Sequence, residues 1–222
     1  SSVGLNGQSV TLRAKHKWKA IIDGTGTTAT NWVLDNKSTS QARIRGFKVQ
    51  NFTAAGNNCG VNLQGTSAVQ VVDMWFHNMS TANGGAGGRS TTTGGAGWID
   101  CTFTSCSCIT ATGGAGLYTT SVHATYRNLI ADSCTTSAQM GGFARFDFAA
   151  GLTQIDGILA TNCSATGALN GGAVGGKNFS LRHMTGVNNT AGNGTGNDLY
   201  IAAGTSHVRN CWLRSSSTAM MV

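Results

Sequence analysis

The stretch IRGFKVQN, at residues 44–51, recurs along the chain at a nearly constant spacing. With Phe47 taken as its fourth residue, the counterparts follow at intervals of 27, 27, 28, 28, 27 and 27 residues: Met74, Cys101, Leu129, Gly157, Met184 and Cys211. Most residues just before them are Gly, Asp or Asn, and the sixth place is mostly apolar. A fixed period of this size is the signature of a solenoid, in which each repeat stacks on the next.

The composition decides which kind of solenoid this is. The 222 residues include 32 Gly and no Pro, and the eight acidic residues are all Asp. Strong helix formers are scarce, and a unit of about 27 residues is too short for two helices besides its strands. We therefore predict an all-β, right-handed parallel β-helix of about seven to eight coils with 27–28 residues each. Residues 1–222 would form one domain, with rungs about 4.8 Å apart.

In such a stack, equivalent residues of successive coils lie directly above one another. The eighth place of the phrase is small and polar throughout, which predicts a structural ladder of stacked amides and hydroxyls along a tight turn. Its members are Asn51, Asn78, Ser105, Ser133, Thr161, Asn188 and Ser215.

The net charge of +7 is concentrated near the N-terminus, since eight of the 15 Lys and Arg precede residue 49. Arg13, Lys15, Lys17 and Lys19 alternate with apolar residues, as on one face of a strand. This face is either simply solvated or, with Arg45, a basic strip for an acidic partner such as an acidic polysaccharide. No nucleic-acid motif is evident, so no nucleic-acid partner is expected. We recognise neither an apolar run near the ~18 residues of a membrane span nor a signal peptide.

Two tryptophans, Trp75 and Trp212, occupy the fifth place of the phrase, which should point outward. They would either stack on sugar rings or merely cover their neighbours.

Three of the seven cysteines, Cys106, Cys134 and Cys163, follow the polar ladder at spacings of 28 and 29. Neighbouring rungs would bring their Cα atoms within disulfide range, so this column is either a disulfide ladder or a ladder of buried thiols. A metal cluster from Cys101, Cys106 and Cys108 is a third reading, although this spacing matches no standard zinc pattern.

Several phrases resemble known β-helix repeats: IDCTFTSC at 99–106, VRNCWL at 208–213, and GGAG at 84–87, 94–97 and 113–116. They are similar to the pectate-lyase-like right-handed β-helix superfamily and to the Gly-Gly-Ala repeats of polymorphic outer-membrane-type adhesins. The resemblance implies an extracellular or cell-surface β-helix. It leaves the function open, because this fold carries lyases, epimerases and adhesins as well as inert spacers.

Two functions remain as hypotheses. The first is a non-catalytic structural, adhesive or filament-forming module without a cofactor, which self-associates through its open coil ends and offers its basic first coil to an acidic partner. The alternative, implied by the resemblance, is a Ca²⁺-dependent lyase or epimerase of a uronic-acid polymer. Asp73 and Asp100, one coil apart, would then hold Ca²⁺, and Arg127 would act as the base. Turn geometry alone also explains Asp at these places.

Overall fold

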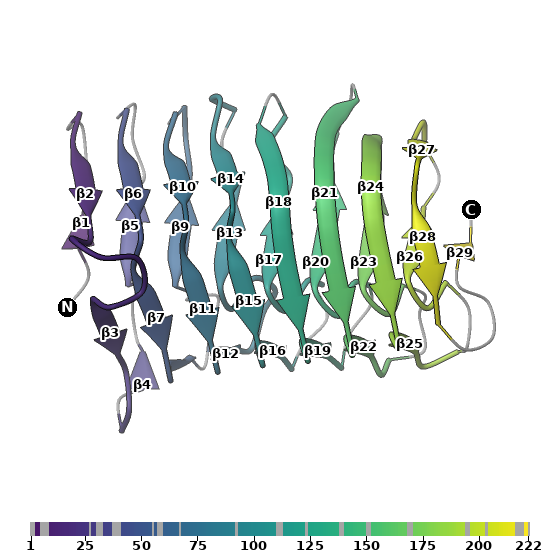
Figure 1. The fold of residues 1–222 in the computed structure, drawn as a ribbon, viewed down its shortest axis with the longest axis horizontal. Helices are drawn as coiled ribbons and strands as arrows, with labels where there is room; N and C mark the ends of the chain where they lie inside the picture. The colour runs from purple at the N-terminus through teal and green to yellow at the C-terminus, as the bar shows by residue number, and fades with distance from the viewer. Residues whose placement is uncertain are drawn as a thin grey trace.

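The computed structural model describes residues 3–4, 9–26, 28–29, 33–36, 41–54, 56, 60–66, 68–91, 93–109, 113–122, 124–137, 140–149, 152–167, 171–193, 196–202, 204–215 and 220–221. They form 29 strands in three sheets, wound into a right-handed parallel β-helix whose coils follow one another from the N- to the C-terminal end (Figure 1).

Each of the first seven coils contributes to all three sheets, and the described strands of the next coil contribute to two of them. The nine-stranded sheet contains β1 (Val3–Gly4), β5 (Leu34–Asn36), β9 (Val61–Leu63), β13 (Gly88–Ser90), β17 (Leu117–Thr119), β20 (Ala144–Asp147), β23 (Val174–Lys177), β26 (Leu199–Ile201) and β29 (Met220–Met221). The seven-stranded sheet contains β4 (Thr28–Ala29), β8 (Thr53–Ala54), β12 (Ser80–Thr81), β16 (Ser107–Cys108), β19 (Thr135–Thr136), β22 (Ser164–Ala165) and β25 (Thr190–Ala191).

The 13-stranded sheet carries the repeated phrase. It contains β2 (Thr11–Arg13), β3 (Ile21–Asp23), β6 (Arg43–Arg45), β7 (Lys48–Gln50), β10 (Gln70–Val72), β11 (Trp75–His77), β14 (Gly97–Ile99), β15 (Thr102–Thr104), β18 (Thr125–Asp132), β21 (Thr153–Thr161), β24 (Phe179–Val187), β27 (His207–Arg209) and β28 (Trp212–Arg214). The long strands β18, β21 and β24 each occupy the place that two short strands take in the other coils (Figure 1).

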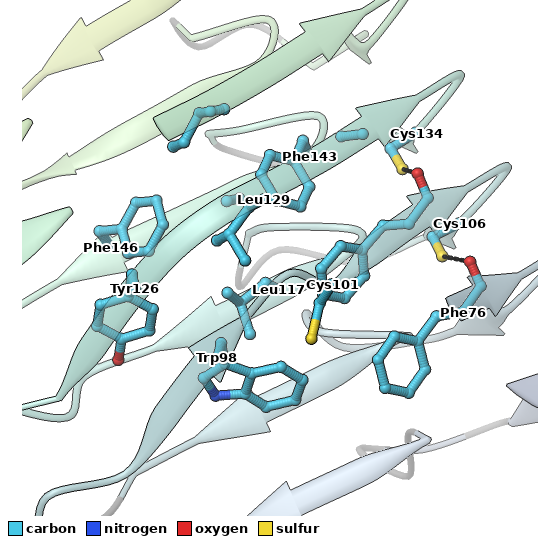
Figure 2. Packing of buried hydrophobic residues seen from close by; sticks show 14 of the residues in the cluster. Phe76, Trp98, Cys101, Cys106, Leu117, Tyr126, Leu129, Cys134, Phe143 and Phe146 are labelled. Carbon is cyan, nitrogen blue, oxygen red and sulfur yellow. Dashed lines mark hydrogen bonds between the residues drawn. The ribbon is translucent and has the colours of Figure 1, made fainter. Parts of the chain in front are cut away.

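The register confirms the predicted stacking of repeats. Strands β11 and β15 pair Phe76 with Phe103, 27 residues apart, in parallel. Their rings stack with centroids 5.1 Å apart, and the Phe143 ring packs on Phe103 from the next coil but one, with centroids 5.3 Å apart. Figure 2 shows Phe76 and Phe143 among the residues of this core. The apolar places of the phrase therefore face a continuous core, in which these three rings are fully buried.

One unit of the repeat is shifted by one residue relative to the prediction. The fourth-place partner of Leu129 is Ile158, not Gly157, so the spacing there is 29 residues and the next one is 26. Because side chains alternate along a strand, a slip of one residue exchanges the inner and outer faces. Ile158 is buried, whereas Leu159 is 40% exposed. The same correction replaces Thr161 by Asn162 in the polar ladder.

Two columns of the phrase adopt the left-handed conformation, which explains their composition. The third-place residues all have φ between 52° and 83°: Gly46, Asp73, Asp100, Asn128, Gly157, His183 and Asn210. The ladder residues do the same, with φ between 50° and 59°: Asn51, Asn78, Ser105, Ser133, Asn162 and Asn188. Gly, Asn and Asp tolerate this region best, which explains why they are frequent where the coil bends.

The predicted basic strand from Arg13 to Lys19 is wrong. Strand β2 ends at Arg13 and β3 begins at Ile21, and the residues between form a turn in which Trp18 has φ of 62°. The cause is tertiary, because the Trp18 amide donates to the Gly46 carbonyl oxygen at 2.6 Å and holds the turn on the second coil.

The cysteine column is in register, since β16, β19 and β22 pair the residues that follow Cys106, Cys134 and Cys163. All three side chains are buried free thiols. Cys106 and Cys134 donate to the carbonyl oxygens of Phe76 and Phe103 at 3.8 and 3.6 Å (Figure 2). Burial raises the pKa of the Cys134 thiol well above its usual value, so this column contains neutral thiols that pack as small apolar groups. Cys59 lies outside the described residues.

Candidate functional site

The outer face of the 13-stranded sheet carries a column of arginines, which we call the outer arginine column. It runs through the last outward place before the left-handed bend: Arg13, Arg45, Val72, Ile99, Arg127, Asp156, Arg182 and Arg209. Neighbouring members lie one rung apart, about 4.8 Å by sheet geometry. Arginine thus occupies five of eight successive positions along the axis of the solenoid.

In the second coil, the charge of the column is neutralised within the protein, with help from Lys17 of the first coil. Lys17 Nζ lies 2.9 Å from Asp73 Oδ1, and the Arg45 guanidinium lies 2.7 Å from Asp73 Oδ2. Burial opposes ionisation of Asp73, but the hydrogen bonds and charges of Lys17 and Arg45 outweigh it and lower the pKa of this carboxyl. The Trp18 indole also donates to the Asp73 carbonyl oxygen at 2.7 Å. Two residues predicted to bind a partner, Lys17 and Arg45, are therefore engaged internally.

The proposed calcium pair does not fit this geometry. Asp73 and Asp100 do occupy the same column on adjacent rungs, but both oxygens of Asp73 already contact cationic side chains. Asp100 Oδ1 accepts a hydrogen bond from Asn128 Nδ2 at 2.9 Å. Among the described residues, no group of three or more His, Cys, Asp or Glu is arranged to hold a metal ion. A cation such as Ca²⁺ would have to displace two positively charged groups to reach Asp73.

The two tryptophans predicted to face outward, Trp75 and Trp212, also differ in their surroundings. Trp75 is half-buried, with Trp18 packed at 5.4 Å between ring centroids and Lys48 Nζ 4.0 Å above the ring. Its indole nitrogen donates to Thr104 Oγ1 at 2.8 Å. Trp212, in the same outward column near the C-terminal end, is 57% exposed. Trp75 thus covers its neighbours, whereas Trp212 presents its ring to solvent.

Beyond the fourth coil the arginine column is exposed. Within the part of the chain that the structure describes, the side chains of Arg127 and Arg209 have no hydrogen bond or ion pair. Arg182 makes one contact, from its guanidinium to Gln154 Oε1 at 3.3 Å. Arg13, Lys15 and Lys19 are also exposed, although they lie in and after the first strand of the sheet.

A groove of about 550 Å³ opens beside this exposed part, at the start of β18, β21 and β24. Arginine, aspartate and amide side chains share its lining with apolar residues: Val122, Ala124, Thr125, Tyr126, Arg127, Leu152, Thr153, Gln154, Asp156 and Arg182. Its volume lies within the range of about 300–1,000 Å³ that is usual for small-molecule sites.

An acidic side chain interrupts the arginines at this groove. Asp156 lies between Arg127 and Arg182 in the register, and its Oδ1 is 2.7 Å from His183 Nδ1. His183 Nε2 lies 3.5 Å from Asn210 Nδ2 on the next rung. If His183 is neutral, the proton sits on Nδ1 facing Asp156, and Nε2 keeps its lone pair. Together, these residues place the cationic donors of the arginines and the anionic acceptor of Asp156 on one surface.

Sequence reasoning found Arg127 but missed Arg182, Arg209 and the Asp156–His183 pair as parts of one site. The signal was present in the spacing, because the one-residue shift in the fifth unit moves Asp156 from the bend column into the arginine column. With the uncorrected register, Asp156 belonged with Asp73 and Asp100.

No family model, curated protein or solved structure matches the chain, so the site must be interpreted from its own residues. Among the described residues, no helix is long and apolar enough to cross a membrane.

Proposed function

We propose that this β-helix is a non-catalytic extracellular or cell-surface adhesive module that binds an acidic polysaccharide along the outer arginine column. The observation that carries the proposal is that Arg127, Arg182 and Arg209 lie in one column of the sheet and are exposed. Arg127 and Arg182 also line the groove. A linear array of cations suits a linear anionic polymer better than a compact ligand.

The chemistry of the guanidinium group supports this choice of partner. Its planar donors match carboxylate and sulfate groups in a two-pronged geometry, which a lysine ammonium does not provide. Exposed contacts of this kind are individually weak and screened by salt. Affinity would therefore come from several contacts along one chain and would fall as the ionic strength rises.

Self-association through the coil ends remains part of this proposal. The described terminal strands β2 and β3 pair with the rest of the sheet on one side only, as do β27 and β28. Core residues at these ends are only partly buried: Leu12, Ile22, Val208, Cys211 and Leu213. Such an edge accepts a further β-rung, and a second copy of the chain would supply one in a filament. Electron microscopy of the purified protein tests this, with discrete monomers at high concentration as the contrary result.

We also propose kinship with the pectate-lyase-like superfamily, supported by the coil architecture and the quoted phrases. The lyase or epimerase alternative is less well supported, because Asp73 is held by Lys17 and Arg45.

The test of the main proposal is affinity electrophoresis or titration against polygalacturonate, alginate and a sulfated glycan, with a neutral glucan as the control. We expect retention by at least one acidic polymer, no retention by the glucan, and loss of binding as salt is raised from low to about physiological strength, where the Debye length is about 8 Å. Equal retention by the neutral glucan, or binding to none of the acidic polymers, would refute the proposal.

A further inference from the structure

We propose that the outer face formed by β24, β27 and β28, with β21 at its edge, binds the surface of an anionic lipid membrane. Arginines contact the lipid phosphates, and exposed apolar side chains enter the headgroup region. The inference goes beyond the proposed function, because it assigns a partner to apolar residues that a hydrophilic polymer along the arginine column leaves uncovered.

A second outward column of the sheet runs parallel to the arginines and is largely apolar. We call it the outer apolar column, and its members occupy four successive rungs: Ile130, Leu159, Thr185 and Trp212. The three large apolar members are 44%, 40% and 57% exposed, in chain order. Single exposed apolar residues are ordinary, but three aligned over about 14 Å of one face mark an interaction surface.

Cations lie on both sides of this column at its C-terminal end. Arg209 precedes Trp212 by three residues, and Arg214 follows it by two on the same strand, β28. Arg182 lies one rung before Arg209. All three arginines are exposed. The chain between Arg209 and Trp212 spans at most about 10 Å, so charged and apolar groups can contact one surface together.

The charge of this region is positive without an opposing carboxylate on its own strands. Strands β24, β27 and β28 contain no Asp or Glu. Asp156, one rung before Arg182 in the arginine column, contacts His183 at 2.7 Å. An anionic surface that approaches from the C-terminal end of this face therefore meets arginines first, which is the complementarity that a negatively charged leaflet requires.

The shape of the apolar surface favours lipid over a folded protein partner. Strands β21, β24 and β28 lie side by side near the C-terminal end (Figure 1), and the apolar column crosses them as a strip one side chain wide. A stable protein interface needs about 800 Å² on each partner, with a closely packed centre. A lipid surface needs no matching pocket, because tryptophan rings settle at the membrane–water interface and guanidinium groups bind phosphates through paired donors.

The experiment measures partition of the purified protein onto unilamellar vesicles by sedimentation at low salt. One preparation contains equal amounts of phosphatidylglycerol and phosphatidylcholine, and the other contains phosphatidylcholine alone. We expect the partition coefficient to be at least tenfold higher on the anionic vesicles. Brominated phosphatidylcholine in the anionic vesicles should quench tryptophan emission, and Trp212→Phe should remove most of this quenching because its ring is the one placed in the interface.

The variants separate the charged from the apolar contribution. Arg209→Ala combined with Arg214→Ala should lower the partition coefficient at least tenfold. Trp212→Ala should lower it at least fivefold, whereas Trp212→Phe, which keeps an aromatic ring, should lower it less. Leu159→Ser should lower it severalfold and leave the affinity for an acidic polysaccharide unchanged, since it alters no charge of the arginine column.

The matched control is Ile21→Ser. Ile21 is 53% exposed and belongs to the same outward column at the N-terminal end, where it pairs with Lys48. Its strand also carries Asp23, so it lies beside an acidic residue and far from the three arginines. This variant should leave partition unchanged. Circular dichroism melting verifies that each variant retains its fold, as expected for exposed side chains.

Three results would overturn the proposal. One is equal partition onto the neutral and the anionic vesicles. Another is anionic partition that Trp212→Ala and Leu159→Ser leave unchanged, because it would reflect only the attraction of a protein with net charge +7 to a negative surface. The third is no partition onto either preparation, which would leave the apolar column to a protein partner. Each of these results leaves the polysaccharide proposal standing, because polymer binding is measured separately.

Discussion

The two ends of the outer face use the same columns of the repeat in opposite ways. Near the N-terminus, Lys17 and Arg45 neutralise Asp73, and Trp75 lies under Lys48 and against Trp18. Here the charges of Lys17 and Arg45 and the ring of Trp75 are engaged in contacts between coils.

Toward the C-terminus, the corresponding places face solvent. Arg127 and Arg209 are exposed, and Trp212 has 57% of its surface accessible. The outward neighbours Ile130 and Leu159 are 44% and 40% exposed. The comparison teaches that a position in a solenoid column does not fix a role. Whether a residue stabilises the protein or can bind a partner depends on what the adjoining rungs supply.

The largest expected effect is on the affinity for an acidic polymer, which should depend on the C-terminal region and not on the first coil. The triple variant Arg127→Ala, Arg182→Ala, Arg209→Ala should lower the affinity for an acidic polymer at least 100-fold, because it removes the three exposed cations in the C-terminal half of the column. The variant Lys15→Ala, Lys19→Ala removes two exposed charges from the first coil and should change it less than threefold. Both affinities are measured by titration under the same salt conditions. Equal losses in the two variants would contradict the comparison.

The next effect concerns stability. Asp73→Asn preserves a residue type that tolerates the left-handed bend but leaves Lys17 and Arg45 without their carboxylate. We expect the free energy of unfolding to fall by about 1 kcal/mol, a modest value because the two cations are half-exposed. Asp156→Asn removes a half-exposed carboxylate whose one partner among the described residues is His183, so it should change the free energy of unfolding by less than about 0.5 kcal/mol. Urea unfolding measures both, and a larger loss for Asp156→Asn would reverse the assignment of the stabilising carboxylate.

The pH dependence sharpens the same contrast. The folded-state pKa of Asp73 is lower than the ordinary 3.8, despite the opposing effect of burial, because Lys17 and Arg45 favour the carboxylate. Its contribution is therefore fully present above this ordinary value and is lost as the pH falls below it, through the folded-state pKa. Wild-type protein should lose stability on acidification below about pH 4, and Asp73→Asn should lose less over that window. Parallel acid-unfolding curves for the two proteins would rule out this role.

The smallest expected effect is that of metal removal. Because both oxygens of Asp73 contact cations, a chelator should leave polymer binding and thermal stability unchanged within error. Incubation with uronate polymers and Ca²⁺ should yield no unsaturated, ultraviolet-absorbing product. A chelator-sensitive product that disappears in Asp100→Ala would restore the lyase alternative.

Much of the fold could be predicted because the information is local and repeated. The spacing of Phe76 and Phe103 placed them on adjacent rungs, and Gly, Asp or Asn at the third place indicated turns, which the structure shows as left-handed bends. The fifth unit could not be aligned in this way. Gly157, Ile158 and Leu159 offer apolar or neutral residues for either register, and only packing shows that Ile158 turns inward.

The candidate site was less accessible to prediction, because it depends on which charges are already paired. Asp73 and Lys17 are 56 residues apart in sequence, yet their side chains meet across two coils. Nothing in the spacing of either residue signals this contact. The predicted binding set therefore mixed residues engaged internally, such as Lys17 and Arg45, with exposed ones such as Arg13 and Trp212.

The amino-acid sequence by itself determined the parallel solenoid, its period and the composition of its bends, because each follows from a pattern that every coil repeats. The tertiary structure alone decided which outward residues remain available to a partner. That outcome depends on long-range electrostatic and packing contacts between rungs, and these follow from the register of neighbouring coils rather than from any single repeat.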